Sequence, residues 1–334
     1  MAMAFEAEQV GKRQSWANII ANIQSQATPF TSMVEKRSKP SQVLHSWQVK
    51  KYPETGHAGV LDGQDATSFD SNPRFLIQCN GQKTWRKPGV SDFADEAEIV
   101  ALEKGEMAEQ IADALVAVKW QIEKRCLSNE DTKNDDGATT GNETRGLFSW
   151  TSPTAQTLYP VPAAFLTPAA QVYTGALANF GERQFLAMCR SSYKQRKGPF
   201  TMHAFLGIDL KASFTDFTKY VDNVANKTPV RQFKQEGDSQ EFVFTVDKLV
   251  LDTGEIHLHP SSFLYTDRVT GQDTAYTHSS GIVVDMDMVG LAYTRMPRVV
   301  KLPYSGGGQK AIVDAIFLNM ADNVLGAMAL KINS

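Results

Sequence analysis

The most regular pattern of apolar and polar positions lies between Asp92 and Leu127. Acidic residues open this segment and Lys124 and Arg125 close it, which favours a helix because these charges complement the helix dipole. The pattern predicts one continuous helix of about 36 residues and about 54 Å, with Gly105 as its one weak point. Such a helix is longer than a compact domain is wide, so it must lie along a surface or brace an extended shape. Apolar residues line one face at intervals of three or four: Met107, Ile111, Leu115, Val118 and Ile122.

The N-terminal region has little pattern up to residue 14, and we expect an arm there that becomes ordered against a partner. A short helix is predicted after Ser15, which is a suitable N-cap. Pro29 ends this helix, because proline moves the preceding residue out of the helical region. The apolar face of the helix consists of Trp16, Ile19, Ile20 and Ile23.

Two extended segments flank a polar stretch near the N-terminus. Apolar and polar side chains alternate from Gln42 to Lys50, which predicts a strand, and a second extended segment covers Phe75–Lys87. Residues 53–74 between them are polar and rich in glycine, so we expect them to project from the body. Asn80-Gly81 is a strong hairpin signal. The sequence leaves open whether the chain turns there or bulges and continues.

Helix and strand signals are mixed in the middle of the chain. Asn129–Gly146 is polar and is predicted to stay out of the core. Thr167-Pro168 is typical of a helix start and Gly181 of a helix end. Phe185–Cys189 is a short apolar run, which predicts a buried strand. A helix followed by a buried strand indicates a mixed α/β lobe.

From residue 242 onward the pattern is mainly that of strands bounded by Gly, Pro, Asp or Thr turns. The last segment, Lys310–Ile332, predicts one or two long strands with a bend near Asp322-Asn323. The predicted fold class is therefore α+β. Further strands are expected at residues 242–246, 254–259, 281–288 and 291–300.

Composition narrows the class of protein. The chain has 334 residues, 42% of them hydrophobic, which allows one large domain or two lobes with a substantial core. The net charge of −3 excludes a dedicated polycationic binder of nucleic acid. Since no apolar stretch approaches the ~18–20 residues that cross a bilayer, we expect no membrane association. The three cysteines are too far apart for a disulfide framework or a CxxC metal site, which favours a reducing compartment: Cys79, Cys126 and Cys189.

Two pairs of side chains at alternate positions suggest catalytic or metal chemistry. His257 and His259 would share one face of a strand, as in some metal sites. We favour two histidines on the solvated side of that strand, because no Cys or carboxylate has matching ligand spacing. Asp285 and Asp287 could supply paired carboxylates for acid and base catalysis. The same alternation is expected of the polar face of a half-buried strand, which we favour.

Three further segments match functional patterns only in part. Asp131–Gly137 resembles a calcium loop but has Lys133 at a ligand position. Gly306–Lys310 lacks the spacing of a phosphate-binding P-loop, and we predict a flexible turn. Lys194–Lys197 is a small basic cluster that a solvated helix end explains equally well. We therefore assign no catalytic, cofactor-binding or metal-binding residues.

Short motifs are spread in order over roughly residues 15–332. They are Ile19–Ile23 and Thr28-Pro29-Phe30, then Asn80–Trp85 and Val90-Ser91-Asp92 ahead of the long helix, Asp252–Ile256 leading to His259-Pro260, and Asp285–Val289, Lys310–Val313 and Gly326-Ala327. In their order and spacing these motifs resemble the major capsid proteins of tailed bacteriophages with the Hong Kong 97-like fold.

This resemblance implies a division of the chain. Residues 1–33 would be an N-terminal arm, 34–92 an extended β loop with its base, and 93–149 a peripheral domain with a long spine helix. Residues 150–284 would form an axial α/β domain around the capsomer centre. Residues 285–334 would be C-terminal strands that return to the peripheral domain. The loop would lie over the neighbouring subunit, so we expect the arm and loop to depend on a neighbouring copy.

The resemblance also implies that the chain is not an enzyme, and it implies a structural function and a set of partners. The subunit would assemble in the host cytoplasm into hexamers and pentamers of an icosahedral head around double-stranded DNA, and would remain in the virion. Its partners would be further copies of itself, a separate scaffold protein, a portal and decoration proteins, with packaged DNA contacted weakly. We assign no covalent crosslink to Lys50, Lys51 or Lys83. The alternatives are a bacterial nanocompartment shell, a tail or adhesion module, and a metal-dependent hydrolase centred on the His and Asp pairs above.

Overall fold

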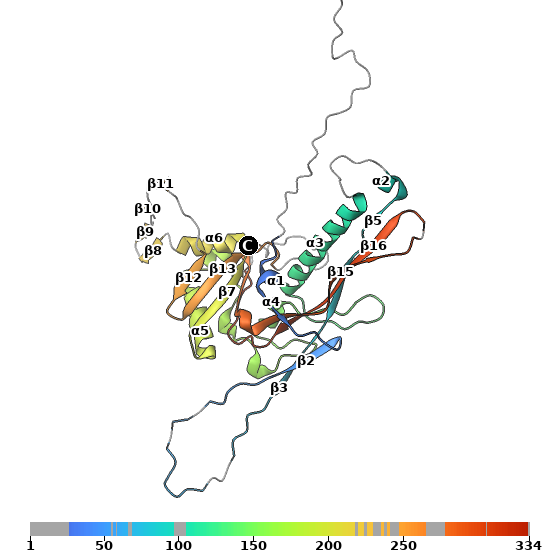
Figure 1. Ribbon diagram of the computed structural model, residues 1–334. Helices are drawn as coiled ribbons and strands as arrows, with labels where there is room; N and C mark the ends of the chain where they lie inside the picture. Colours follow the sequence, from blue (N-terminus) through green and yellow to red (C-terminus); the bar gives the residue numbers. More distant parts are fainter. Residues whose placement is uncertain are drawn as a thin grey trace, which may run out of the picture.

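A computed structural model of the chain contains two larger β-sheets and a long excursion that leaves the body (Figure 1). It describes residues 27–54, 56–57, 59–65, 69–96, 105–217, 247–264, 278–304 and 306–332, with the backbone of four short strands between residues 220 and 240. The helix predicted after Ser15 and the strand predicted at 242–246 lie outside these residues. The short strands form two ribbons: β8 (Tyr220–Asn223) with β9 (Asn226–Pro229), and β10 (Gln235–Glu236) with β11 (Ser239–Gln240).

The six-stranded sheet has the order β12-β13-β7-β14-β17-β6. Its strand β7 (Phe200–Leu206) buries Met202 and Ala204 in one core with helices α5 (Glu182–Arg196) and α6 (Ile208–Phe217). Phe205 of the same strand belongs to a different core on the other face. The remaining strands are β12 (Lys248–Leu251), β13 (Gly254–Pro260), β14 (Gly281–Val284), β17 (Met328–Leu330) and β6 (Val172–Tyr173).

The five-stranded sheet is built on the antiparallel pair β15 (Val289–Lys301) and β16 (Gln309–Ala321). Register shifts in β15 fall on either side of Arg295, next to Pro297, which cannot donate to a ladder. Helix α3 (Glu106–Cys126) packs on this sheet and buries Val118 and Ile122. The other elements here are β1 (Glu35–Arg37), β4 (Gln82–Arg86), β5 (Gly89–Val90) and α2 (Asp92–Glu96).

One apolar core joins the two sheets. Phe30, in the short helix α1 (Pro29–Met33), is fully buried, and its ring meets that of Phe205 edge to face with centroids 5.5 Å apart. Helix α4 (Leu147–Trp150) adds Phe148 and Trp150 to the same core. Because the sheets share these contacts, a change at the junction destabilises both of them.

The excursion begins as a two-stranded ribbon of β2 (Leu44–Val49) and β3 (Phe75–Asn80). Both strands were predicted, and the described residues of the 53–74 segment project from the body as expected (Figure 1). The chain does not turn back at Gly81: β3 pairs with β2, whereas β4, directly after it, pairs with β16. The Asn80-Gly81 signal therefore marks a change of partner strand, with the Gly81 N–H donating to the Val43 carbonyl at 2.8 Å.

The prediction of one continuous helix between Asp92 and Leu127 is wrong. Helix α2 is described over Asp92–Glu96, and α3 begins at Glu106. The residue before α3, Gly105, has φ +82° and ψ 154°, a conformation that glycine adopts readily and that no helix can contain. The helix that packs on the five-stranded sheet therefore has 21 residues.

The helix predicted from Thr167-Pro168 to Gly181 and the strand predicted at Phe185–Cys189 are both wrong. Phe185–Cys189 lies inside α5, whose buried face continues to Ser192 at helical spacing. The polar Ser192 hid this period in the sequence; its hydroxyl donates to the Gly326 carbonyl at 2.7 Å. The earlier segment contains short turns instead: η3 (Ala169–Gln171), β6 and η4 (Leu177–Asn179), after η2 (Ala163–Phe165).

Among the described residues of the C-terminal third, the predicted strands are present except at one strand end. Strands β13 and β15 cover the segments expected at 254–259 and 291–300, and the last segment is broken between β16 and β17, close to the predicted bend. The strand expected at 281–288 ends at Val284. There the Asp285 carboxylate accepts from the Asp287 N–H and starts the short helix η5 (Met286–Met288).

The polar segment Asn129–Gly146 enters the core at its ends, contrary to prediction. Thr132, Thr144 and Arg145 are buried, while the middle of the segment is exposed. Their polar groups find partners inside the protein: for example, the Thr132 hydroxyl donates to the Glu143 carbonyl at 2.8 Å. Polar side chains can be buried at low cost when their hydrogen bonds are satisfied, and the residue types alone do not reveal this pairing.

Arg145 is the largest of these buried polar side chains, with 0% of its surface exposed. Its guanidinium donates to Asp131 Oδ1 at 2.6 Å and to the Leu158 carbonyl at 2.6 Å. It also lies over the Trp150 ring, 4.4 Å from the ring centre. One side chain thus connects three separate segments of the body.

Replacing Arg145 with methionine should destabilise the fold strongly. The substitution leaves Asp131 without its cation and the Leu158 carbonyl without its donor. We expect the free energy of unfolding in urea to fall by about 3–5 kcal/mol, the range for breaking a buried ion pair. Lys133→Met removes two partly exposed ion pairs from the same segment, with Glu130 and Glu143, and should cost only about 1 kcal/mol. Similar losses in both variants would contradict the role given to Arg145.

Candidate assembly surfaces

The most exposed large apolar side chains of the described surface lie in three places. The projecting loop, defined as residues 50–74, exposes Val60, Leu61 and Phe69 at 81%, 78% and 88%. The far end of the five-stranded sheet exposes Phe93, and the outer strand β12 exposes Val250. Apolar side chains gathered on projecting elements are typical of surfaces that bind another protein.

The base of the projecting loop is fixed to the core. Trp47 of β2 contacts Trp150 with ring centres 5.8 Å apart, and Phe75 of β3 contacts Phe165 at 5.5 Å. Between β2 and β3 the described residues form no helix or strand. They do form a turn at the tip, where the Gln64 N–H donates to the Leu61 carbonyl at 3.2 Å. The loop is therefore anchored at both ends and unsupported in between.

The part of the projecting loop between its two ends is acidic as well as apolar. Residues 53–73 contain no Lys or Arg but four carboxylates: Glu54, Asp62, Asp65 and Asp70. A segment with this chemistry is suited to a surface that is basic and partly apolar.

The start of the described chain is held by a buried carboxylate. Glu123 of α3 accepts hydrogen bonds from the backbone N–H groups of Phe30 at 2.8 Å and Thr31 at 2.7 Å, at the N-terminus of α1. Burial raises the pKa of Glu123, while the same two amide groups act in the opposite direction. This contact fixes the point from which residues N-terminal to α1 extend.

The far end of the five-stranded sheet is braced by a polar contact. The Tyr304 hydroxyl, in the connection between β15 and β16, donates to the Asp92 carboxylate of α2 at 2.7 Å. This bond holds α2 beside the β15–β16 hairpin, while Phe93 of α2 points to solvent with 93% of its surface exposed. The exposed Phe93 side chain is therefore presented by a helix that is held in place.

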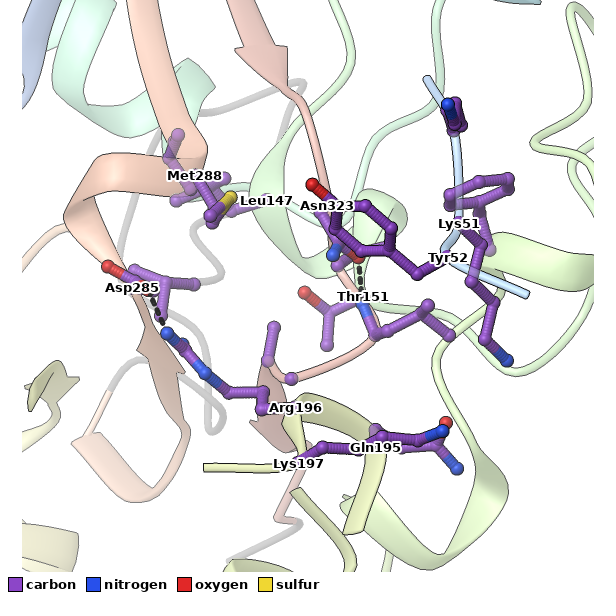
Figure 2. Close-up of a pocket in the computed structure, with 18 residues that line it drawn as sticks. Lys51, Tyr52, Leu147, Thr151, Gln195, Arg196, Lys197, Asp285, Met288 and Asn323 are labelled. Atoms are coloured by element: carbon purple, nitrogen blue, oxygen red, sulfur yellow. Dashed lines mark hydrogen bonds and ion pairs between the residues drawn. The ribbon is translucent and has the colours of Figure 1, made fainter. Parts of the chain in front are cut away.

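A cavity of about 410 Å³ lies beside the base of the projecting loop. Figure 2 shows Lys51 and Tyr52 on one side of it, and the ion pair of Arg196 with Asp285, 2.5 Å long, on the opposite side. The lining has four cationic side chains against one carboxylate, so the cavity is basic. Its apolar part is supplied by Leu147, Phe165, Val284, Val289, Val324 and Leu325.

The structure adds a third histidine to the predicted pair. His257 and His259 share one face of β13, as expected, and Ile256 and Leu258 are buried on the other. His203 of the neighbouring strand β7 stacks with both, with ring centres 5.2 Å from His257 and 5.3 Å from His259. The sequence did not reveal His203, because β7 was not predicted and no spacing links it to the HxH pair.

Burial lowers the pKa values of His203 and His259, and the neighbouring histidines lower them further. The described residues contain no group of three His, Cys, Asp or Glu side chains arranged to hold a metal ion. Charged groups on adjacent elements have smaller effects on these two pKa values. Asp285 and Asp287 raise the pKa of His203, whereas Lys211 lowers and Asp247 raises the pKa of His259.

The remaining candidates have structural roles. Asp285 is engaged by Arg196 and by the start of η5, so it does not form a catalytic carboxylate pair with Asp287. Lys194–Lys197 lies at the end of helix α5, one of the two interpretations that the sequence left open, with Lys197 in the left-handed region at φ 57°. Gly306–Gly308 form a turn before β16 begins at Gln309; Gly308 has φ +118°, and a Cβ there would lie 1.9 Å from a backbone oxygen.

The segment Asp131–Gly137 is held by its own polar groups. The Asp136 carboxylate accepts from the N–H groups of Ala138, Thr139 and Thr140 at 2.8–2.9 Å, so it caps a turn rather than facing an ion. No helix among the described residues is long and apolar enough to cross a membrane.

Comparison with known families identifies the chain. It matches the SU10 major capsid protein family over residues 3–315. The chain belongs to this family. It is therefore the major capsid protein of a tailed bacteriophage, a non-enzymatic component of the virion that forms the icosahedral head. No curated protein matches it.

The capsid protein also shares its fold with solved capsids at low sequence identity. The capsid of cyanophage P-SCSP1u is 11% identical with a TM-score of 0.60, covering 96% of this chain and 93% of that one. The capsid of a native GTA particle is 11% identical with a TM-score of 0.59, covering 98% of this chain and 97% of that one. A chain in the structure of Mycobacterium phage Bobi is 11% identical with a TM-score of 0.58, covering 97% of this chain and 96% of that one. These matches confirm the predicted α+β, Hong Kong 97-like fold.

Family membership decides among the functions that the sequence left open. A phage head is favoured over a nanocompartment shell or a tail module, and the hydrolase hypothesis is wrong. The functional parts of the capsid protein are accordingly its contact surfaces. Sequence patterns indicated the projecting loop, but they gave no sign of the cavity, whose lining comes from distant segments.

Glu123→Gln in the capsid protein should loosen α1. Glutamine retains one acceptor oxygen, and its NH₂ group then faces one of the two backbone donors. Loss of a hydrogen bond to a charged group costs about 1.5–3 kcal/mol, so we expect amide exchange at Phe30 and Thr31 to accelerate by about tenfold or more. Glu109→Gln, at an exposed position of α3, is the control. Unchanged exchange at α1 in Glu123→Gln would disprove the clamp.

The histidine cluster should make the fold less stable in acid. Because the folded-state pKa values of His203 and His259 are lowered, the unfolded chain takes up protons first as the pH falls below about 6.5. Stability is therefore full above that pH and is lost as the pH falls through the folded-state values. Urea midpoints at pH 7.5 and 5 should show a drop that His203→Asn reduces. The exposed control His278→Asn should leave the drop unchanged, and equal drops in wild type and His203→Asn would refute this account.

Proposed function

We propose that this capsid protein forms the hexamers and pentamers of the head mainly through its projecting loop. The observation that carries the proposal is the exposure of Val60, Leu61 and Phe69 on a loop whose two ends are firmly anchored. A chain that merely had to fold would gain nothing from three large apolar side chains in water. A neighbouring copy that covers them would recover their burial free energy, about 25 cal/mol per Å².

The division of labour within the subunit follows the Hong Kong 97-like pattern. Residues 1–33 would be the arm, 34–92 the loop with its base, and 93–149 the peripheral domain with its helix. The axial domain, 150–284, would surround the capsomer centre, and residues 285–334 would return to the peripheral domain. The clamp of Glu123 on α1 supports the assignment of an arm, since it gives the preceding residues a fixed point of departure.

Other partners belong to the proposal as well. A separate scaffold protein, a portal and decoration proteins would complete a head that assembles in the host cytoplasm. The net charge of −3 supports only weak contact with packaged DNA at the inner face, because strong attraction needs a positive surface. We propose no covalent crosslink at Lys50, Lys51 or Lys83.

Deletion of residues 54–74 tests the loop directly. Because the described part of this segment lacks core contacts, the shortened subunit should keep its urea midpoint and its circular dichroism spectrum. Assembly into megadalton particles, followed by size exclusion and electron microscopy, should fail. The test uses the conditions under which the full chain assembles, with its scaffold partner where one is needed.

Two outcomes would oppose the proposal. A globally unfolded product would show that the loop supports the subunit itself. Normal particles from the shortened chain would show that the loop is dispensable for assembly.

A further inference from the structure

We propose that the cavity at the base of the projecting loop receives the tip of the projecting loop, Val60–Asp65, of a neighbouring copy. This inference depends on the proposed role of the loop in assembly and adds the site that receives it. The cavity and the tip carry opposite charges, both have apolar side chains, and the cavity is large enough to receive the Leu61 side chain.

The charge of the cavity is positive and only partly neutralised. Arg196 is paired with Asp285, and Lys197 approaches Glu54 of the same loop at 3.9 Å, with both side chains largely exposed. Such an exposed pair contributes little. Among the described residues, Lys50 and Lys51 have no acidic partner, although both line the cavity. These two lysines are thus available to an incoming carboxylate.

The interior of the cavity adds an apolar lining and an unused polar group. Thr151 lines it with a side chain that is fully buried, and its hydroxyl has no hydrogen-bond partner among the described residues. Figure 2 places Thr151 in the middle of the lining, between Arg196 and Asn323. A buried hydroxyl without a partner is uncommon in folded proteins, and a backbone or carboxylate oxygen from the tip would satisfy it.

The tip is a compact turn that carries complementary chemistry. Gly63, at φ +77°, allows the chain to reverse, and the Gln64 N–H closes the turn on the Leu61 carbonyl. Leu61 is 78% exposed beside the carboxylates of Asp62 and Asp65. A cavity of about 410 Å³ lies within the usual range for binding sites, and Leu61 would fill its apolar part.

The occupant must come from another copy. Figure 1 shows the loop running away from the body, with its tip far from the base where the cavity lies. Each subunit therefore carries a tip and a cavity that cannot meet within the chain. Contacts between unlike surfaces of identical subunits form closed rings when the rotation closes, which fits a capsomer.

A charge-reversal cycle tests the pairing. The cavity variant carries Lys50→Glu with Lys51→Glu, and the tip variant carries Asp62→Lys with Asp65→Lys. We expect each to lower the yield of assembled particles about tenfold or more, since like charges would then face each other. A variant with all four substitutions should recover most of the wild-type yield, because opposite charges face each other again.

A matched control separates local pairing from net charge. Lys83→Glu with Lys87→Glu changes the charge of the subunit as the cavity variant does, at two exposed lysines on and just after β4, away from the cavity. This control should assemble normally. Circular dichroism and urea midpoints should show that every variant is folded before its assembly is scored.

The outcomes distinguish this inference from the proposed function. The cavity would not be the receptor if the variant with all four substitutions failed to recover its particle yield. The same conclusion would follow if the control lost as much yield as the cavity variant. If deletion of residues 54–74 still abolished assembly in that case, the role of the loop would stand and its receptor would lie elsewhere. If the deletion assembled normally, the proposed function itself would fail.

Discussion

A buried cation, that of Arg145, holds separate segments of this capsid protein together. Its guanidinium binds Asp131 and the Leu158 carbonyl and covers one face of Trp150. Trp150 in turn contacts Trp47 at the start of the projecting loop. Because a buried charge is tolerated only when its partners are held in place, these segments are fixed relative to one another. The rigid base of the loop is a consequence of this network.

A rigid base gives an unsupported loop its direction. The projecting loop contributes apolar side chains that the subunit does not cover, and the charge on its tip is opposite to that of the cavity. The subunit therefore keeps its own stability in the two sheets and their common core, where Phe30 meets Phe205. Separating the residues that fold the subunit from those that join subunits allows the chain to fold first and assemble afterwards.

Much of this architecture could be predicted from local patterns. Alternation identified β2 and the long C-terminal strands, and the polar, glycine-rich composition of residues 53–74 identified the loop. Short-range signals failed where a distant partner decided the outcome. The buried face of α5 includes Ser192, which looks polar until its bond to Gly326 is known. Likewise, nothing near Arg145 in the sequence indicates that its charge would be paired inside the core.

The cavity and the histidine cluster could not be predicted either, because both are formed by residues that are distant in the sequence. Lys51, Arg196 and Asp285 come together only because the loop base, α5 and the start of η5 pack around one point. His203 joins the HxH pair through the pairing of β7 with β13, a register that no local pattern contains. Gly105 is a different case: glycine weakens a helix locally, which the sequence does show, and α3 begins directly after the positive φ of this residue.

The central claim is that the projecting loop has no structural support within its own subunit and gains it from a neighbour. Amide hydrogen exchange across residues 50–74, measured in isolated subunits and in assembled heads, tests this most directly. The account predicts rapid exchange in isolated subunits and strong protection in heads, with little change at the buried strand β7. Equal protection of the loop in both states would contradict it.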